Sequence, residues 1–249
     1  MKYYGFFITI ICLSSCGIYR QNVVNVPLME KKGQAQLSAH IVLTGYDGQA
    51  AFALTNHFLI TANYSDMGTT RKNYSSTNFE VSNHTFGEIG GGYYRKNSKG
   101  LIAEYILNFG KGTTSGSGAG GDTIVGHTAP YTYFNSADYN RFLIQADFGK
   151  SKDKFEYSFS PRIFVLNYYN VVDTQNDSFK NLPNTFVWTD YAITLRYKPI
   201  KNIKISGQIC LTIPVTGYKA AFYEASPINC SIGIIANLNL FKSTPTQEH

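Results

Sequence analysis

Apolar and polar side chains alternate along most of this chain, in ten runs between residues 33 and 241. Alternation with a period of two is the signature of β-strands, because successive side chains of a strand point to opposite faces. The runs cover residues 33–43, 47–55, 57–65, 85–95, 100–110, 138–149, 154–168, 185–198, 201–213 and 228–241. The pattern predicts an all-β fold of about ten antiparallel strands.

The connections between these runs differ in length according to the side on which they fall. The long connections are residues 66–84, 111–137, 169–184 and 214–227, and they all lie on one side of an up-and-down arrangement. Every connection on the other side is a tight turn. Short periplasmic turns and longer extracellular loops are typical of outer-membrane barrels. The chain is therefore predicted to be an antiparallel up-and-down transmembrane β-barrel with periplasmic N- and C-termini and extracellular long loops.

The two faces of the runs have different chemistry. In residues 138–149, Phe142, Ile144 and Phe148 alternate with Arg141 and Gln145. In a membrane barrel the apolar face points outward and the polar face lines the lumen, while a soluble barrel reverses them. Aromatic residues near the strand ends are expected to form girdles at the membrane interfaces: Tyr94, Tyr105, Phe109, Tyr139, Phe155, Tyr168, Trp188, Tyr197 and Phe241.

Composition agrees with a single membrane domain. Charged residues make up 15% of the 249 residues, against about 25% in ordinary soluble domains. The net charge of +6 is spread over short turns and is not gathered in one motif, so no nucleic-acid partner is expected.

The first residues read as an export signal. Lys2 is followed by an apolar stretch and by Leu13-Ser14-Ser15-Cys16, a segment too short to span a membrane as a helix. This box resembles the bacterial lipoprotein signal, which implies that Cys16 carries acyl chains and that outer-membrane lipids are partners. An ordinary secretory signal with an incidental cysteine is the alternative. The expected organisation is a signal peptide (1–15), a lipidated periplasmic tether (16–32), the barrel (33–241) and a C-terminal tail (242–249).

Two further motifs carry a family resemblance. Pro27-Leu28-Met29-Glu30-Lys31-Lys32-Gly33 and Gly45-Tyr46-Asp47-Gly48-Gln49-Ala50-Ala51 resemble the start of lipid-anchored outer-membrane β-barrel proteins found in Bacteroidota. The resemblance implies architecture and location, and it implies no activity.

Eight charged residues fall on lumen-facing positions of the predicted strands: Glu88, Glu104, Arg141, Asp147, Glu156, Arg162, Asp190 and Arg196. Such a set can form either a charged pore constriction or a salt-bridged, filled core. Narrow barrels are filled by side chains, which favours the second interpretation.

No motif for catalysis, metal or cofactor binding is found. The histidines lack the spacing of metal or catalytic clusters. His84 and His127 fall in predicted surface loops. His84, beside Ser82, is the nearest approach to the pair that a lipid A-modifying barrel needs. Nothing matches the motifs of omptin surface proteases.

Cys210 and Cys230 lie in the last two predicted strands. Alternation places their sulfur atoms on opposite sides of the sheet, which favours two free thiols. A bulge would bring them together.

The remaining candidates lie in the predicted loops. The glycine- and serine-rich residues 112–126 are predicted to be a flexible surface loop. Aromatic residues suited to recognition of a partner or ligand are Tyr131, Tyr133, Phe134, Tyr169 and Tyr223. The expected function is a non-enzymatic structural or accessory subunit of an outer-membrane complex. A small pore, a surface protease or a lipid A-modifying enzyme is the alternative.

Overall fold

The computed structural model describes residues 21–72, 79–124, 127–174, 184–216 and 227–240, and these include ten β-strands. None of these residues belongs to a helix that is long and apolar enough to cross a membrane. The strands are β1 (Gln34–Val42), β2 (Gly45–Ala53), β3 (Phe58–Lys72), β4 (Phe79–Lys96), β5 (Leu101–Ile124), β6 (His127–Lys152), β7 (Phe155–Asp173), β8 (Thr185–Ile200), β9 (Ile203–Pro214) and β10 (Ile228–Asn239).

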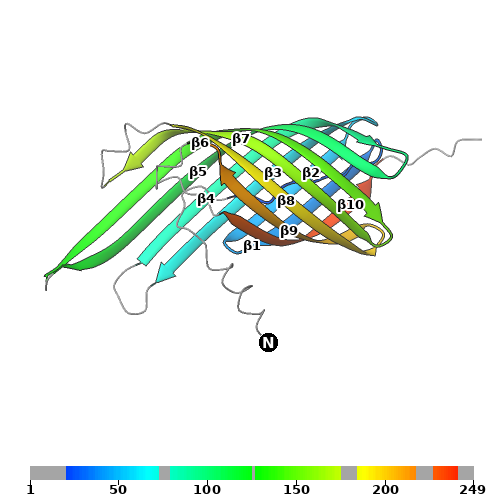
Figure 1. Ribbon diagram of the computed structural model, residues 1–249. Helices are drawn as coiled ribbons and strands as arrows, with labels where there is room; N and C mark the ends of the chain where they lie inside the picture. Colours follow the sequence, from blue (N-terminus) through cyan, green and yellow to red (C-terminus); the bar gives the residue numbers. More distant parts are fainter. Residues whose placement is uncertain (1–20, 73–78, 125–126, 175–183, 217–226, 241–249) are drawn as a thin grey trace, which may run out of the picture.

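Each strand pairs antiparallel with its neighbours in sequence, and β1 also pairs with β10, so the sheet closes into a barrel (Figure 1). The closing ladder runs from Gln34 opposite Asn239 to Val42 opposite Ser231. The predicted up-and-down barrel of ten strands is thereby confirmed. We call the end that carries the connections after β2, β4, β6 and β8 the turn end, and the opposite end the loop end.

Local chemistry explains the tight turns. Between β4 and β5, the Asn97 side chain accepts hydrogen bonds from the backbone N–H groups of Lys99 and Leu101, both at 2.9 Å. Gly100 follows with φ of 78°, a conformation that glycine adopts without steric cost. Asp153, between β6 and β7, also has positive φ, which aspartate tolerates better than most residues.

Large apolar side chains cover the outside of the barrel. On β9 and β10, Ile209, Ile232 and Ile234 are 60%, 70% and 61% exposed, while Gln208 and Ser231 point inward and are buried. Apolar area on this scale is unfavourable in water and favourable in hydrocarbon. The alternation therefore has the polarity of a transmembrane barrel, with the apolar face outward.

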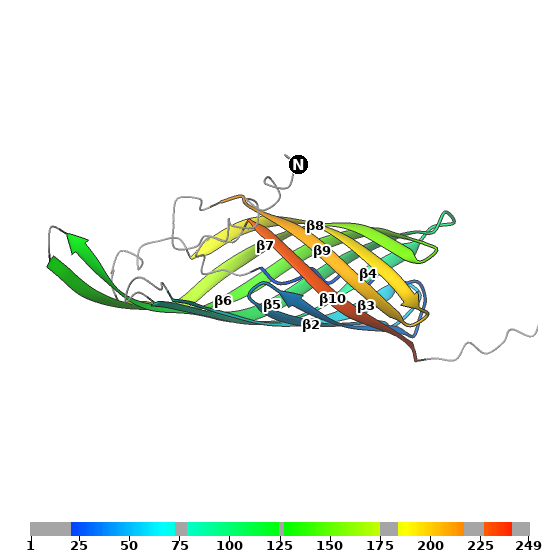
Figure 2. The ribbon, with the colours of Figure 1, turned by 90° about the horizontal axis from the view of Figure 1, so that it is seen from below.

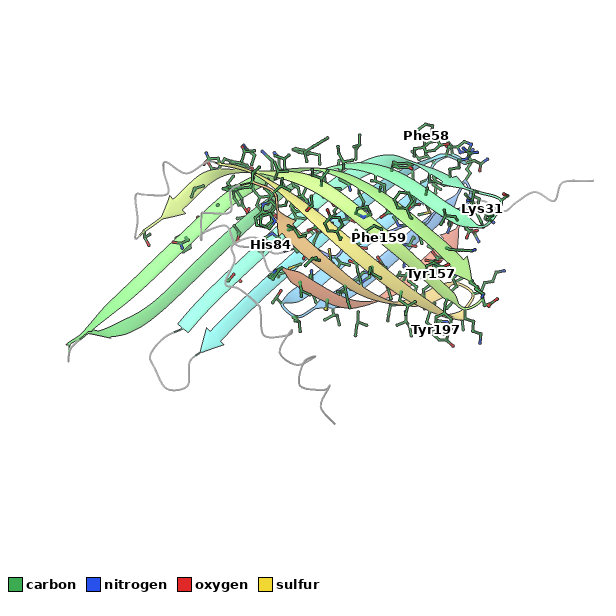
Figure 3. The ribbon with its side chains drawn as sticks, viewed as in Figure 1. Lys31, Phe58, His84, Tyr157, Phe159 and Tyr197 are labelled. Atoms are coloured by element: carbon green, nitrogen blue, oxygen red, sulfur yellow. The ribbon has the colours of Figure 1, made fainter. Side chains whose placement is uncertain are left out.

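Aromatic residues occupy both surfaces of the wall. Phe58, Tyr157 and Tyr197 lie outside, around the turn end (Figure 3). The predicted girdle is wrong for four of its members, which point inward and are buried: Tyr94, Tyr139, Tyr168 and Trp188. They lie on the lumen-facing parity of their strands, and nearness to a strand end does not determine the face. Phe241 lies outside the described residues.

The height of the wall varies strongly around the barrel. β1 and β2 have 9 residues each, whereas β5 and β6 have 24 and 26. The β5–β6 hairpin projects far beyond the rest of the loop end in both ribbon views (Figures 1 and 2).

The predicted long loops are correspondingly too long. Residues 112–124, predicted as flexible, belong to β5 and pair with β6 as far as Ile124 opposite His127. Backbone pairing with the neighbouring strand overrides the weak strand preference of glycine and serine here. β3, β4 and β7 likewise extend into residues predicted as loops.

Candidate functional site

The chain's own N-terminal residues fill the centre of the lumen. Residues 21–29, which we call the luminal segment, have no secondary structure, and each is buried. This placement corrects the polar periplasmic tether predicted over residues 16–32. The segment includes Val23, Val24, Val26 and Leu28, apolar side chains that a solvated tether does not need. The predicted lipidation site, Cys16, and the signal peptide lie outside the described residues.

The luminal segment runs from one end of the barrel to the other. At the turn end, Glu30 pairs with Lys96 at 2.7 Å, and the Lys32 N–H donates to the side chain of Asn56. Toward the loop end, Gln21 contacts Asn229 and Cys210, near the loop ends of β10 and β9. The chain between these two points therefore traverses the lumen.

Side chains of the wall donate hydrogen bonds to six consecutive carbonyl oxygens of the luminal segment. The pairs are Asn229 Nδ2 to Gln21 O (2.6 Å), Arg162 Nη2 to Asn22 O (3.2 Å), Gln49 Nε2 to Val23 O (2.8 Å), Gln208 Nε2 to Val24 O (3.0 Å), Gln145 Nε2 to Asn25 O (2.7 Å) and Arg196 Nη2 to Val26 O. A buried backbone carbonyl without a partner costs about 1–3 kcal/mol. The wall thus satisfies an extended chain without adding a strand to it.

Backbone N–H groups of the same segment also find partners on the wall. Val24 N donates to Gln208 Oε1 at 2.8 Å, so Gln208 bonds both backbone groups of one residue. Leu28 N and Met29 N donate to the two carboxylate oxygens of Glu104 at 2.9 and 2.6 Å. Leu28 has φ of 51°, and this bend directs both amides at one carboxylate.

The structure places all eight predicted lumen residues inside the barrel, and three buried ion pairs join six of them. Arg141 pairs with Glu88 at 2.7 Å, Arg162 with Asp190 at 2.5 Å and Arg196 with Glu156 at 2.6 Å. Lys204 also reaches Glu156, at 2.9 Å, and sequence reasoning missed it. Its position on the same face of β9 as Cys210 is the signal that identifies it.

Two of the arginines converge on one residue of the luminal segment. Asn22 Oδ1 accepts from Arg141 Nη1 at 2.8 Å and from Arg162 Nη2 at 3.3 Å. The guanidinium carbon of Arg141 also lies 4.1 Å from the centroid of the Phe86 ring. The predicted charged network therefore holds a peptide as well as forming ion pairs within itself.

A buried hydrophobic cluster packs against Arg141, whose guanidinium carbon lies 4.1 Å from the ring centroid of Phe86 and 5.5 Å from that of Phe164. We call it the aromatic cluster, and its members are Phe86, Ala137, Tyr139, Leu143, Phe164, Leu166, Tyr168, Phe186 and Trp188. They project inward from β4, β6, β7 and β8. Rings of Phe86 and Tyr139 stack with centroids 5.8 Å apart. The cluster fills the lumen beside the end of the luminal segment that contains Asn22, since Arg141 contacts both Asn22 and Phe86.

The predicted surface position of His84 is wrong. His84 lies on β4, points inward and is 1% exposed, with Nε2 2.6 Å from the Tyr139 hydroxyl. Its ring stacks on Phe86 and Tyr139. Figure 3 places it in the part of the barrel opposite the tight turns. A histidine packed in this way does not reach the membrane-facing rim, where a lipid A-modifying pair with Ser82 would have to lie. His127 opens β6 and is also not in a loop.

Most of the predicted loop recognition residues lie on strands. Tyr131, Tyr133 and Phe134 belong to β6, and Tyr169 belongs to β7. The loops were overestimated because the alternation fades where β5 and β6 become rich in small residues. Phe134 is exposed on the projecting hairpin. Tyr223 lies outside the described residues.

The two cysteines of the barrel are free, as the alternation favours. Cys210 points inward and is buried, while Cys230 is exposed on the outer face. Cys210 Sγ accepts a hydrogen bond from Gln21 Nε2 at 2.9 Å.

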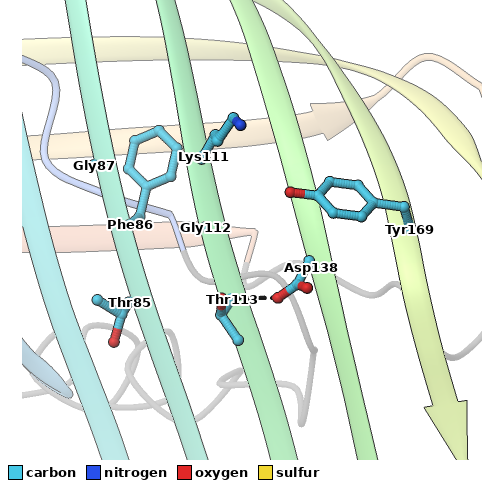
Figure 4. Close-up of a pocket in the computed structure, with 8 residues that line it drawn as sticks. All are labelled: Thr85, Phe86, Gly87, Lys111, Gly112, Thr113, Asp138 and Tyr169. Carbon is cyan, nitrogen blue, oxygen red and sulfur yellow. Dashed lines mark hydrogen bonds between the residues drawn. The ribbon is translucent and has the colours of Figure 1, made fainter.

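A shallow depression of about 360 Å³ lies on the outer face of β4–β7 toward the loop end (Figure 4). Its polar members include Lys111, Asp138 and Tyr169. The Asp138 carboxylate accepts from Thr113 Oγ1 and from Asn170 Nδ2, each at 2.9 Å. These bonds satisfy Asp138 within the wall.

No three or more His, Cys, Asp or Glu side chains come together in a metal-binding arrangement among the residues described. Besides Lys204, sequence reasoning missed the role of four amides on lumen-facing positions: Gln49, Gln145, Gln208 and Asn229. Their parity along the strands was readable. Their role was not, because it depends on a segment far away in the sequence.

Comparison with family models and with curated proteins found no match to this sequence. Several solved structures are similar in fold. The outer membrane protease OmpT from Escherichia coli has 8% identity and a TM-score of 0.45, over 82% of this chain and 90% of that chain. The KdgM porin in complex with disordered oligogalacturonate has 12% identity and a TM-score of 0.32, over 82% and 98%. LpxR from Salmonella typhimurium has 8% identity and a TM-score of 0.34, over 82% and 99%.

Proposed function

We propose that this protein is an outer-membrane lipoprotein whose barrel is a non-enzymatic structural or accessory subunit, and that its loop-end hairpins bind a partner. The placement rests on the outward apolar face and on the tight turns at one end. The anchor rests on the lipoprotein signal that ends at Cys16.

The observation that carries the proposal is the β5–β6 hairpin. Its strands stay paired from Leu101 opposite Lys150 to Ile124 opposite His127. A paired ribbon of this length loses less conformational entropy on binding than a flexible loop does. Exposed Phe134 gives the hairpin an aromatic side chain of the kind that anchors interfaces.

The contents of the lumen support the same reading. The luminal segment and the aromatic cluster occupy the space through which a solute would pass. A barrel whose lumen is filled in this way is suited to binding a partner through the hairpins at its loop end.

Co-purification from envelopes in a mild detergent tests the proposal. The decisive variant removes residues 119–132 and joins Gly118 to Tyr133, a cross-strand pair, through an Asn-Gly turn. We expect a partner to copurify with the full chain and to be lost from this variant. A matched variant that shortens residues 217–226 should retain it. Absence of any stable partner of the full chain would contradict the proposal.

A small gated pore is a second candidate, and one observation favours it. The luminal segment is held by hydrogen bonds and packing. Cys210, which accepts a hydrogen bond from Gln21, is a free thiol and forms no disulfide with the segment. Displacement of the segment would leave a lumen lined by Arg141, Arg162 and Arg196. Single-channel recordings test this candidate. If the full chain and a folded variant without residues 21–29 are both silent, this candidate is eliminated.

A further inference from the structure

The path of the luminal segment determines where the beginning of the chain emerges. Residues 30 and 32 are fastened to Lys96 and Asn56 at the turn end. Gln21 is fastened to Asn229 and Cys210 toward the loop end. After residues 30–33, β1 starts at the turn end and runs toward the loop end as part of the wall. Residues 21–42 therefore form a hairpin whose first arm lies inside the barrel and whose second arm is part of it.

We propose that the chain crosses the outer membrane inside its own barrel and that Cys16 is presented at the loop end, with its acyl chains in the external leaflet. This inference rests on the lipid anchor and membrane placement of the proposed function. It reverses the expected position of the N-terminus, which the tether interpretation puts in the periplasm.

The reach of the chain supports this placement. Cys16 precedes Gln21 by five residues, and an extended chain spans at most about 3.6 Å per residue, so the connection covers at most about 18 Å. The apolar band of such barrels is about 25 Å tall. The connection is therefore shorter than this band is tall, so a chain that starts from Gln21, near the loop ends of β9 and β10, is too short to cross the whole band.

A return through the lumen is blocked. Residues 22–29 already occupy that path, and five side chains of the wall donate hydrogen bonds to their carbonyl oxygens. Acyl chains would also meet charged side chains there, including Arg162 and Asp190, which are buried. Hydrocarbon among buried charges is unfavourable because it deprives them of polar partners.

A lateral exit through the wall is blocked as well. β1 and β10 are paired over their joint length, from Gln34 opposite Asn239 to Val42 opposite Ser231. β1 is paired equally with β2 on its other side. The opening available to residue 20 and those before it is the loop end.

Cysteine labelling on intact cells tests the inference with the full chain in its native membrane. The background carries Cys230→Ser, because that thiol is exposed on the outer face, whereas Cys210 is buried. Arg20→Cys is the test variant. Ser98→Cys in the turn after β4 marks the periplasmic side, and Gly126→Cys between β5 and β6 marks the external side. The probe is a membrane-impermeant maleimide, and unheated electrophoresis checks that each barrel is folded.

We expect Arg20→Cys to react on intact cells as completely as Gly126→Cys, with Ser98→Cys reacting only after permeabilisation. Reaction of Arg20→Cys only after permeabilisation would overturn the inference. If Arg20→Cys is silent in both conditions, an epitope inserted between Ile18 and Tyr19 decides: antibody binding on intact cells supports the inference, and binding only to permeabilised cells overturns it. The readout does not involve a partner, so it stands or fails independently of the subunit role.

Discussion

The lumen has two regions that are filled by different means. Around the luminal segment, polar side chains of the wall form hydrogen bonds with a peptide backbone. Arg196, for example, pairs with the Glu156 carboxylate and donates to the carbonyl oxygen of Val26. Beside it, toward the loop end, the aromatic cluster packs on itself. Each amide group buried in a barrel needs its own hydrogen-bond partner, whereas the apolar faces of aromatic rings are stabilised by packing against one another. The polar region therefore matches the hydrogen-bonding groups of one chain segment, whereas the aromatic region is filled by packing that other apolar side chains could also provide.

The largest expected effect comes from removing the luminal segment. We expect deletion of residues 21–29 to give ion conductance in planar bilayers, where the full chain is silent, because the wall's polar groups would then be hydrated. Deletion of residues 175–183, a stretch of equal length in the sequence between β7 and β8, should leave the protein silent. A folded, silent deletion variant would mean that wall side chains alone close the lumen.

Arg196→Ala breaks the polar region at one point. It removes one partner of Glu156 and the donor to Val26 O. Breaking a buried pair on one side costs about 3–5 kcal/mol, and because Lys204 still pairs with Glu156 the expected loss is at the lower end of this range. We expect a loss of this size in the free energy of unfolding, measured by urea titration in lipid vesicles. Arg95→Ala, at an exposed position near the end of β4, is the matched control and should have little effect. Equal losses would show that the buried network is not specific.

Leu166→Ala probes the aromatic cluster, where Leu166 is fully buried. Truncation of a buried leucine costs about 2–5 kcal/mol through lost contacts and the cavity left behind. We expect destabilisation in the same titration with no conductance, since the luminal segment keeps its bonds. Conductance in this variant would show that the two regions are coupled.

The smallest effect is expected at the turn end, where Lys96 pairs with Glu30 in solvent. Both side chains are about 40% exposed. Exposed pairs contribute about 0–1 kcal/mol. We expect Lys96→Ala to change the unfolding free energy by less than about 1 kcal/mol and to leave Arg20→Cys labelling unchanged. A larger loss would indicate that this pair fastens the start of the luminal segment.

The sequence was sufficient for the architecture because its strongest signal is local. Alternation gives the strands and their faces, and parity along β6, β7 and β8 placed residues such as Arg141, Arg162 and Asp190 inside. The same parity was enough to keep Cys210 and Cys230 apart. Each of these inferences depends on neighbours one or two residues away.

What the sequence did not reveal depends on contacts between distant residues. The bond between Asn229 and Gln21 joins positions 208 apart, and nothing in residues 21–29 indicates which wall they meet. The paired length of β5 was hidden because its glycines and serines have little strand preference of their own. Aromatic residues near strand ends were misassigned for a related reason, since Tyr139 and Trp188 obey parity and not position.

The hairpin formed by the luminal segment and β1 has a consequence for folding order. With the lipid proposed above on Cys16, the chain end could not be threaded into the ring of strands after the ring has closed. The luminal segment must therefore enter the lumen before β1 pairs with β10, so that the barrel closes around it. If β1 paired with β10 before the luminal segment entered, the barrel would close around an unfilled lumen. The order of these two steps therefore determines whether the lumen is filled.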